Sequence, residues 1–331
     1  MTTTVAVTGA DGFIGSHLVE ALVARGFRVR AMAQYNSLGS WGWLDSLASD
    51  VMAGVEVVSG DITDGDTVRA LVEGAGTVYH LAALIAIPYS YRAPRSYVDV
   101  NVVGTLNVLE AVRAQGCDRL VHTSTSETYG TALTVPISEV HPVQAQSPYA
   151  ASKVGADKLV ESYHASFELP AVTLRPFNTF GPRQSARAVI PTVVSQVAAG
   201  CEEILLGALD PTRDFLFVQD TANAFVTVGT APSGVVAGQT FNAGTGEEIS
   251  VGALASLVCE LMGRPVPVRL DDQRLRPAAS EVMRLVCDSS KLRQATGWAP
   301  GFSLADGLKQ TIEWFLDPAN LALYRPGSYA R

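Results

Sequence analysis

Short runs of apolar and β-branched residues alternate with longer amphipathic segments over the first half of the chain. This alternation predicts parallel strands joined by crossover helices, that is, an α/β fold with a doubly wound parallel sheet of the Rossmann type. Helices are predicted over residues 16–26, 101–116 and 149–167, and the first two end at a glycine, as many helices do. The six predicted strands span residues 5–9, 27–33, 55–61, 77–83, 119–125 and 171–177.

The pattern becomes less regular beyond residue 176, where glycine, proline and short mixed segments are more frequent. We therefore expect a Rossmann domain over residues 1–176 and a smaller α+β substrate domain over residues 177–331. We also expect the two domains to exchange segments. Neither an internal repeat nor a flexible linker is visible.

Composition and charge weigh against several classes of protein. Of the 331 residues, 47% are hydrophobic and 17% are charged, which is typical of a globular protein and not of a disordered one. The net charge of -8 and the absence of long basic runs argue against nucleic acid or an anionic membrane as a partner. The sequence has no signal-like start and no apolar run of membrane-spanning length, so we expect a cytoplasmic protein.

Cysteine and histidine positions indicate neither a disulfide framework nor a metal site. The four cysteines are widely separated and form no CxxC pair. The five histidines share no metal-ligand spacing. We therefore expect no bound metal.

A glycine-rich turn joins the first predicted strand to the first predicted helix. The spacing of Gly9, Gly12 and Gly15 suits a tight turn, close approach of a pyrophosphate and close helix packing. The turn predicts a dinucleotide site with the phosphates at the helix N-terminus. The predicted cofactor contacts of this turn are Gly9, Asp11, Gly12, Phe13, Ile14 and Gly15.

The adenosine end of the predicted cofactor is less well defined. Asp61 and Ile62 close the third strand, where a carboxylate and a backbone amide could meet the adenine edge. An acidic residue normally follows the second strand and excludes a 2′-phosphate, but residues 31–37 contain none. Arg30 lies within that strand, and no cluster of arginines nearby indicates a 2′-phosphate either. The choice between NAD and NADP stays open.

Tyr149 and Lys153 are four residues apart on a predicted helix and therefore share one face. A hydroxyl-rich stretch, residues 123–130, ends the fifth strand at the edge of the sheet where open α/β folds bind ligands. A tyrosine is a weak base at its ordinary pKa, but a neighbouring ammonium favours the phenolate. Tyr149 can then accept a proton from a sugar hydroxyl, while Lys153 lowers the pKa of Tyr149 and binds the nicotinamide ribose.

Several motifs together resemble the extended short-chain dehydrogenase/reductases of the nucleotide-sugar epimerase/dehydratase family, over nearly the whole chain. They are GADGFIG (9–15), HLAA (80–83), TSTSETYG (123–130), YAASK (149–153), RPFNTFGPRQ (175–184) and PTRDFLFVQD (211–220). More narrowly, segments 35–45, 183–192 and 207–215 resemble sugar 4,6-dehydratases of the legionaminic acid pathway. The resemblance implies further cofactor contacts at Leu81, Ala82, Ala83 and Thr123, beside Tyr149 and Lys153.

Within this family, a Thr-Asp/Ser-Glu triplet at the strand end is typical of 4,6-dehydratases, and here it reads Thr125, Ser126, Glu127. The resemblance implies that Glu127 removes the C5 proton after C4 has been oxidised and that Thr125 hydrogen-bonds the C4 oxygen. Ser126 would orient the C6 hydroxyl or relay a proton to it. Whether Ser126 or Glu127 is the acid at C6 stays open.

The expected substrate is a nucleotide-linked sugar, whose diphosphate needs cations. The resemblance implies contacts from Asn178 in RPFN and Arg213 in RDF, with Arg276 and Glu281 at the positions of a phosphate arginine and a ribose acid. Arg187 is a further candidate. Arg183, in the same part of the chain, is another candidate cation for the diphosphate.

The sequence therefore predicts an NAD(P)-dependent nucleotide-sugar 4,6-dehydratase that holds its cofactor through the cycle, with UDP- or GDP-N-acetylglucosamine as the candidate substrate. Alternatives are a 4-epimerase, against which Glu127 argues, and a UDP-glucuronate decarboxylase, which would need an arginine for the C6 carboxylate. A catalytically silent NAD(P)-binding sensor is the alternative outside the enzymes. The resemblance also implies a homodimer formed through helices 101–116 and 149–167.

Overall fold

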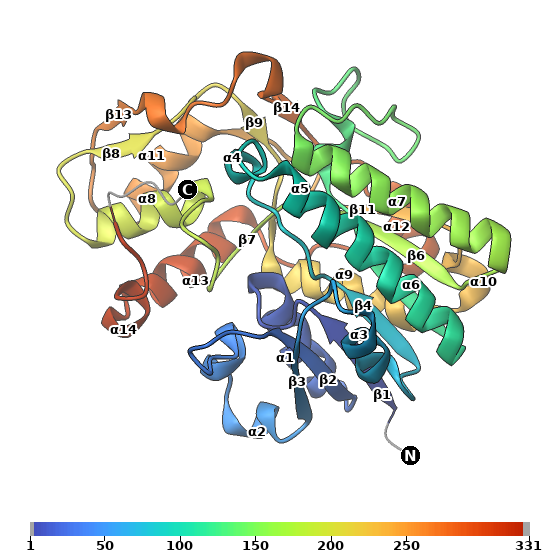
Figure 1. Cartoon of the computed structure of the whole chain (residues 1–331). Helices are drawn as coiled ribbons and strands as arrows, with labels where there is room; N and C mark the ends of the chain where they lie inside the picture. The colour runs from blue at the N-terminus through green and yellow to red at the C-terminus, as the bar shows by residue number, and fades with distance from the viewer. Residues whose placement is uncertain (1–2, 327–331) are drawn as a thin grey trace.

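The computed structural model describes residues 3–326. A seven-stranded parallel sheet with the order β11-β6-β5-β4-β1-β2-β3 lies at its centre, and helices cover both faces (Figure 1). The prediction of a doubly wound Rossmann-type sheet is confirmed. The strands are β1 (Thr4–Thr8), β2 (Arg28–Gln34), β3 (Val55–Gly60), β4 (Thr77–His80), β5 (Arg119–Thr123), β6 (Ala171–Pro176) and β11 (Thr240–Ala243).

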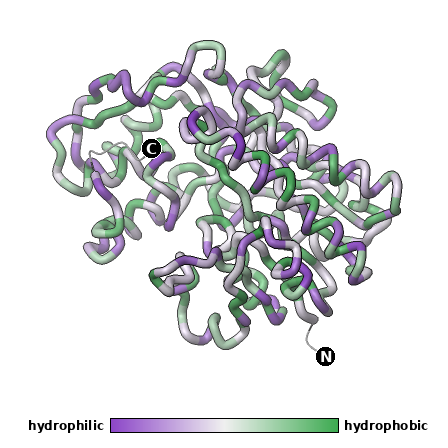
Figure 2. Tube along the Cα trace, in the orientation of Figure 1, coloured by the Kyte–Doolittle hydropathy of each residue, from purple (hydrophilic) through white to green (hydrophobic). Residues whose placement is uncertain are grey.

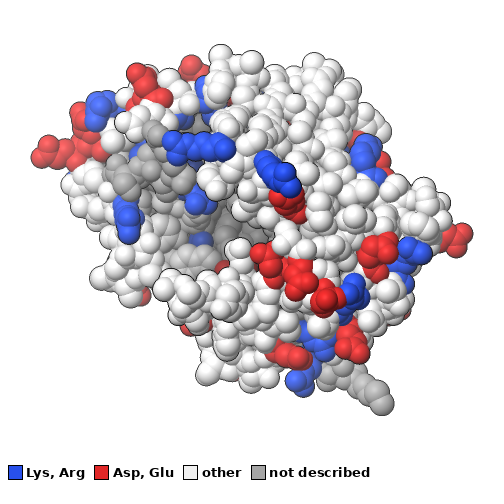
Figure 3. Space-filling model, in the orientation of Figure 1, with Lys and Arg blue, Asp and Glu red and all other residues white. Residues whose placement is uncertain are grey.

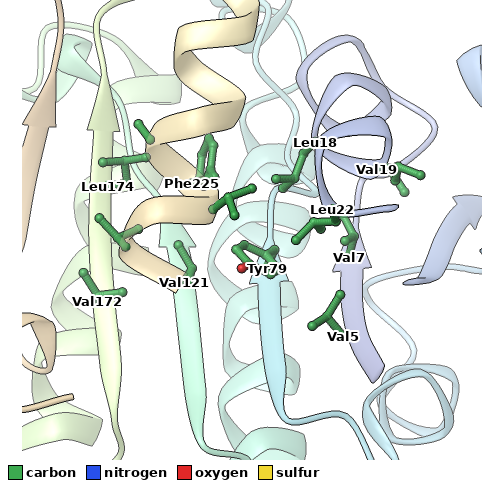
Figure 4. Close-up of a cluster of buried hydrophobic side chains, with 14 of the residues drawn as sticks. Val5, Val7, Leu18, Val19, Leu22, Tyr79, Val121, Val172, Leu174 and Phe225 are labelled. Atoms are coloured by element: carbon green, nitrogen blue, oxygen red, sulfur yellow. The ribbon is translucent and has the colours of Figure 1, made fainter. Parts of the chain in front are cut away.

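Alternate residues of the strands feed two hydrophobic layers, because successive side chains point to opposite faces of a sheet. On one face, Val5 and Val7 pack with Leu22 of α1 (Phe13–Ala24) and Phe225 of α9 (Val218–Thr230), as Figure 4 shows. On the other face, Ala6 packs with α3 (Gly65–Val72), α6 (Gly104–Gln115) and α7 (Pro148–Phe167). Figure 2 shows the hydrophobic residues concentrated along the strands and the inner sides of the helices.

The three helices predicted above all form, with shifted starts. The first begins at Phe13, directly after the glycine turn. Before α6, residues Val98–Val103 form a π-helix, η2, and α6 ends at Gly116 in the left-handed conformation (φ 62°). Ser147 caps α7 by accepting a hydrogen bond from Ala150 N (3.1 Å).

The seventh strand was missed by the sequence analysis. Strand β11 is four residues long, comes from beyond residue 176 and pairs in parallel with β6 at the edge of the sheet. Helix α9 also comes from beyond residue 176 and packs beside α1. The later part of the chain therefore returns to the Rossmann sheet, while the division into domains 1–176 and 177–331 stays a prediction.

The smaller part has its own core, built around α8 (Val189–Ala198), α11 (Val251–Leu261) and α13 (Leu304–Leu316). Its short strands are β7 (Asn178–Phe180), β8 (Ile204–Leu206), β9 (Thr212–Arg213), β10 (Phe215–Phe217), β12 (Ile249–Ser250), β13 (Val268–Leu270) and β14 (Arg284–Leu285). The remaining helices are η1 (Gly42–Ser46), α2 (Ser49–Met52), α4 (Ile87–Ser90), α5 (Pro94–Tyr97), η3 (Ser126–Tyr129), α10 (Ser233–Val236), η4 (Asp272–Arg274), η5 (Ala278–Ser280), α12 (Ser290–Thr296) and α14 (Pro318–Leu321).

Residues 3–326 contain neither a helix suited to crossing a membrane nor a side-chain cluster suited to a metal. No helix in this range combines the length and the apolar character needed to cross a membrane. Across the same residues, no three His, Cys, Asp or Glu side chains gather as a metal site would require. The four cysteines are unpaired thiols.

Candidate active site

The glycine turn leaves no room for side chains at two of its positions. Gly9 has a φ of +66°, and a Cβ there would lie 2.7 Å from the backbone nitrogen of Ala82. A Cβ at Gly15 would overlap the carbonyl oxygen of Gly9. Thr8 Oγ1 accepts hydrogen bonds from the backbone nitrogens of Leu81 and Ala82, both at 3.1 Å. The turn and the HLAA segment are thus held against each other at the carboxyl ends of β1 and β4.

The Asp11 side chain reaches from the glycine turn to the end of β2, a strand after which the sequence analysis found no acidic residue. Its Oδ2 accepts a hydrogen bond from Gln34 N (2.9 Å), and its carbonyl oxygen accepts one from Trp43 N (3.0 Å). Burial raises the pKa of the Asp11 carboxyl. Trp43 also packs edge-on against Trp314 of α13, with the ring centres 5.7 Å apart.

Asp61 and Ile62 follow β3 as predicted, but only one of the two side chains is accessible. Asp61 is exposed, and its Oδ1 accepts hydrogen bonds from Thr63 N and Oγ1 at 2.8 and 2.7 Å. Ile62 is buried against α6, where a Cβ at Gly104 would lie 3.0 Å from its side chain. The Asp61 carboxylate is therefore accessible at this turn, and its contact with adenine stays a prediction.

Tyr149 and Lys153 lie on consecutive turns of α7, and both are buried, with exposed fractions of 8% and 4%. Burial raises the pKa of Tyr149, and a hydrogen bond with the Thr125 side chain acts in the opposite direction. Burial lowers the pKa of Lys153 to about 8, opposed by the Asp157 carboxylate one turn further along the helix. The structure therefore brings together the tyrosine, the lysine and the threonine that the sequence predicted.

We expect a Lys153→Met variant to be more stable than the wild type at neutral pH. The pKa of Lys153 falls from 10.5 to about 8 in the folded protein, so holding the buried ammonium costs up to about 3 kcal/mol of unfolding free energy below pH 8. Between pH 8 and 10.5 the unfolded chain binds more protons, and this cost disappears as the pH rises. Urea unfolding of both proteins across this range measures the difference. A difference in unfolding free energy between the two proteins that stays the same at every pH would contradict the lowered pKa of Lys153.

Glu127 belongs to a cluster of charged side chains that we call the acid–arginine cluster: Glu127, Arg213, Arg276 and Glu281. Arg276 Nη1 lies 3.9 Å from Glu127 Oε1 and 3.8 Å from Glu281 Oε1. Arg213 Nη2 donates to Glu281 Oε1 at 3.2 Å. Burial lowers the pKa of Arg213, and the two carboxylates raise it. Arg276 Nη1 is buried yet makes no hydrogen bond, so it has a donor left for a ligand.

The remaining triplet and substrate residues lie close by. Ser126 is buried and stands between Thr125 and Glu127 at the start of η3. Asn178 begins β7, which pairs with β10 directly after the Arg213 strand, and its backbone nitrogen donates to Asp214 O at 3.1 Å. Figure 3 shows that the face in view is hollowed, with Lys and Arg side chains on the upper and left sides of the hollow and Asp and Glu side chains at its lower right edge.

The two arginines of the segment 183–187 have different surroundings. Arg183 has a positive φ of 70°; its guanidinium is paired with Glu20 of α1 and lies 3.1 Å from His17 Nδ1. Glu20 therefore neutralises Arg183, whose guanidinium ties this segment to α1, although its buried Nη1 makes no hydrogen bond. Arg187 is exposed and lines a pocket of about 300 Å³ with Tyr89, Tyr97 and residues 83–86.

The Arg187 pocket includes Tyr97, a neighbour of Tyr149 that the sequence analysis missed. The Tyr97 ring packs edge-on against Tyr149, with the ring centres 6.2 Å apart. Burial raises the pKa of Tyr97 to about 12, and the Arg187 guanidinium opposes that rise. Tyr97 lies more than 50 positions before Tyr149 in sequence, and its only local signal was its place in a short segment rich in tyrosine.

Comparisons with known proteins show which family this chain resembles. The chain matches the family described as GDP-mannose 4,6 dehydratase over residues 6–311. A UDP-glucose 4-epimerase of Mycolicibacterium smegmatis is 36% identical over 93% of this chain and 97% of the relative. A dTDP-glucose 4,6-dehydratase of Xanthomonas campestris pv. campestris is 33% identical over 94% of this chain and 92% of the relative.

A solved structure extends the match to three dimensions. The dTDP-glucose 4,6-dehydratase of Streptomyces venezuelae, solved with NAD bound, superposes with a TM-score of 0.85 at 28% identity, covering 96% of this chain and 98% of that one. The glycine turn, the Tyr149–Lys153 pair and the parallel sheet occur here together in one chain. The chain therefore belongs to the extended short-chain dehydrogenase/reductase family of NAD(P)-dependent nucleotide-sugar epimerases and dehydratases.

Proposed function

We propose that this protein is a nucleotide-sugar 4,6-dehydratase that forms a 4-keto-6-deoxy sugar nucleotide. The observation that carries the proposal is the position of Glu127, on the helix that follows Thr125 and beside Arg276. Thr125 in turn contacts Tyr149. A carboxylate in the same site as the proton-accepting tyrosine is what a C5 base requires.

Oxidation at C4 is the first step in this proposal. The glycine turn, the HLAA segment and Lys153 would hold NAD(P), which supplies a reversible hydride acceptor. Tyr149 accepts the proton of the C4 hydroxyl, and Thr125 holds the C4 oxygen. Lys153 is charged below pH 8, so its ammonium favours the phenolate form of Tyr149.

Elimination of water follows at C5 and C6. The C4 ketone acidifies the C5 proton, which Glu127 removes, and the C6 hydroxyl leaves as water with a proton from Ser126 or Glu127. Reduction at C6 and return of a proton to C5 complete the cycle, so substrate and product differ by one water and there is no net redox change. Arg213 and Arg276 bind the diphosphate in this scheme.

We propose UDP- or GDP-N-acetylglucosamine as the substrate, on the resemblance to dehydratases of the legionaminic acid pathway. A second candidate has one observation in its favour. Arg187 is an exposed arginine whose pocket adjoins Tyr149 through Tyr97. Such a cation could bind a C6 carboxylate, as UDP-glucuronate decarboxylation would require.

Mass spectrometry of the purified protein with a panel of nucleotide sugars tests these candidates. The panel pairs UDP, GDP, dTDP and CDP with glucose, mannose, N-acetylglucosamine and glucuronate, each with NAD and with NADP. Loss of one water, with the ketone trapped by borodeuteride, would support the dehydratase. Loss of carbon dioxide would mean decarboxylation, and unchanged mass with altered retention would mean epimerisation. Inertness toward every donor would favour the sensor alternative.

We propose NAD as the preferred cofactor. The Asp11 carboxylate at the end of β2 occupies the place where an acidic side chain bonds the ribose hydroxyls and repels a 2′-phosphate. Binding of both dinucleotides by calorimetry should favour NAD, and an Asp11→Asn variant should lower the ratio of NAD to NADP affinity. Equal affinities in the wild type would contradict the proposal.

We expect a Gly15→Ala variant to bind the dinucleotide roughly 10-fold to 100-fold more weakly, since relieving an overpacked methyl costs about 1 to 3 kcal/mol. The added Cβ would push the Gly9 carbonyl out of the turn. Gly234→Ala is the matched control, because a Cβ there meets no atom within 4 Å. Fluorescence titration with the reduced dinucleotide measures both. Unchanged affinity in Gly15→Ala would mean that the phosphates bind elsewhere.

We propose a homodimer formed through α6 and α7. Val98, Val103 and Phe167 are large apolar side chains exposed on or next to these helices. Leu109 and Val112 instead face the sheet and are excluded from the interface. Light scattering should give twice the mass of the chain, and Val103→Asp should lower it, whereas Val235→Asp on α10 should not. A monomeric wild type would contradict the proposal.

A further inference from the structure

A chain of buried polar side chains lies behind the site and has no part in the chemistry proposed above. Tyr129 is the last residue of η3, the short helix that also carries Glu127, and it is fully buried. Its hydroxyl donates to Asn242 Oδ1 (2.8 Å) and accepts from Arg175 Nη1 (3.0 Å). The Arg175 guanidinium also lies 5.0 Å from the centre of the Tyr129 ring. Strands β6 and β11 therefore hold the end of η3.

Arg175 extends this chain to the helix that carries the tyrosine and the lysine. Its Nη2 donates to Asp157 Oδ2 at 2.9 Å, and Asp157 lies on α7 one turn beyond Lys153. Oδ2 also accepts from Ser124 Oγ (2.6 Å), and Oδ1 lies 3.0 Å from His122 Nε2. Both carboxylate oxygens are thus occupied by groups from β5 and β6, which fixes α7 against the end of the sheet.

The far end of the chain is anchored as well. Asn242 Nδ2 donates to Ile137 O at 3.0 Å, and Asn242 N donates to Glu139 Oε1 at 2.7 Å. Both acceptors belong to the connection 131–147 between η3 and α7. The two catalytic elements and the segment that joins them are therefore bonded to one set of buried side chains.

A gain in folding stability does not by itself explain why these polar side chains are buried together. A buried ion pair contributes little compared with apolar side chains of the same size, because both ions lose their hydration. What such a pair can provide is a single geometry, since any other arrangement leaves a buried charge without its partner. Tyr129, Arg175 and Asp157 are only 0%, 4% and 2% exposed, so water cannot readily replace the lost partners.

We propose that Tyr129, Arg175 and Asp157 are positioning residues that hold Glu127 at the correct distance from Tyr149, so that proton removal at C5 follows oxidation at C4. The inference rests on the proposed dehydratase function. It predicts that loss of the hydrogen bonds at Tyr129 slows proton removal at C5 but not oxidation at C4. Glu127 would shift with η3, whereas Tyr149 and Lys153 would stay in place on α7.

The test compares Tyr129→Phe with the wild type in single turnovers. The variant keeps the ring and loses only the hydroxyl that Arg175 and Asn242 hold. We expect oxidation at C4, read from the absorbance of the reduced nicotinamide, to stay within about 3-fold of the wild type. Loss of water should slow by roughly 10-fold to 100-fold, the cost of a small misplacement of a reacting group. Hydrogen–deuterium exchange of residues 126–130 should become faster, which is a readout independent of activity.

Two further variants keep the test decisive. Arg175→Lys retains a cation beside Asp157 but loses the fork that also reaches Tyr129, so the same separation of steps is expected. Tyr163→Phe, which removes a hydroxyl bonded to Glu110 on the outer side of α7, should change neither step.

Three results would count against the inference. Equal slowing of both steps with a lower melting temperature would reduce the chain to a structural role and overturn the inference. Unchanged rates in Tyr129→Phe and Arg175→Lys would do the same. A wild type that reduces its cofactor but loses no water would instead remove the proposed function, and the inference with it.

Discussion

Replacing Tyr149 by Phe should lower the rate of oxidation at C4 by roughly 100-fold to 10,000-fold, the range expected when a general base is removed. The hydroxyl is the group that accepts the C4 proton in the proposed mechanism. The ring can keep its edge-on contact with Tyr97, so the fold and dinucleotide binding should persist. Single-turnover absorbance of the reduced nicotinamide measures the effect directly.

The control for this prediction lies on the same helix. Tyr163→Phe removes a phenol hydroxyl from α7 at its bond to Glu110 and should leave the rate unchanged. Retention of full activity by Tyr149→Phe would rule out the proposed base. A protein whose only measurable property is dinucleotide binding, unaltered by the substitution, would fit the sensor alternative.

The Glu127→Gln variant should oxidise its substrate and then stop. The amide keeps the size of the side chain but cannot accept the C5 proton, so loss of water should fall by roughly 100-fold to 10,000-fold. The reduced nicotinamide should accumulate together with the 4-keto sugar. Rapid quenching with borodeuteride, followed by mass spectrometry, measures the trapped ketone and the water lost.

Glu281→Gln is the matched comparison within the acid–arginine cluster. Glu281 contacts Arg213 and Arg276, the two proposed diphosphate ligands, so its amide should change substrate affinity more than the elimination rate. A Glu127→Gln enzyme that still releases water at the wild-type rate would assign the C5 base to another group. One that interconverts sugar epimers at full rate would place the protein among the epimerases.

Local patterns in the sequence determined the framework of this protein. Short apolar runs located six strands of the sheet, because helices cover both faces and the side chains on both sides of a central strand are buried. The glycine spacing located the turn because a Cβ at Gly9 or Gly15 has no room. The spacing of Tyr149 and Lys153 was sufficient to predict that the two side chains lie together, because a helix places residues four apart on one face.

Residues that meet across long sequence distances followed no such pattern. Strand β11 (TFNA) is not an apolar run, and its partner β6 lies about 65 residues earlier. The sequence analysis looked for an acidic residue directly after β2. The Asp11 carboxylate reaches the end of that strand from the glycine turn, because the turn packs against Gln34. In both cases the contact depends on how the elements pack.

The two arginines of the segment 183–187 make the distinction most clearly. The sequence placed both among the possible phosphate ligands, since residue type and neighbourhood are the same. In the folded protein Glu20 neutralises Arg183, whereas Arg187 stays exposed in a pocket beside Tyr97. The sequence by itself determined six strands of the sheet, the glycine turn and the shared helix face of Tyr149 and Lys153, which depend on short-range patterns. Only the tertiary structure decided which charged side chains pair within the protein and which remain accessible to a ligand. A charge interacts most strongly with groups a few ångströms away, and the packing of distant segments determines which groups those are.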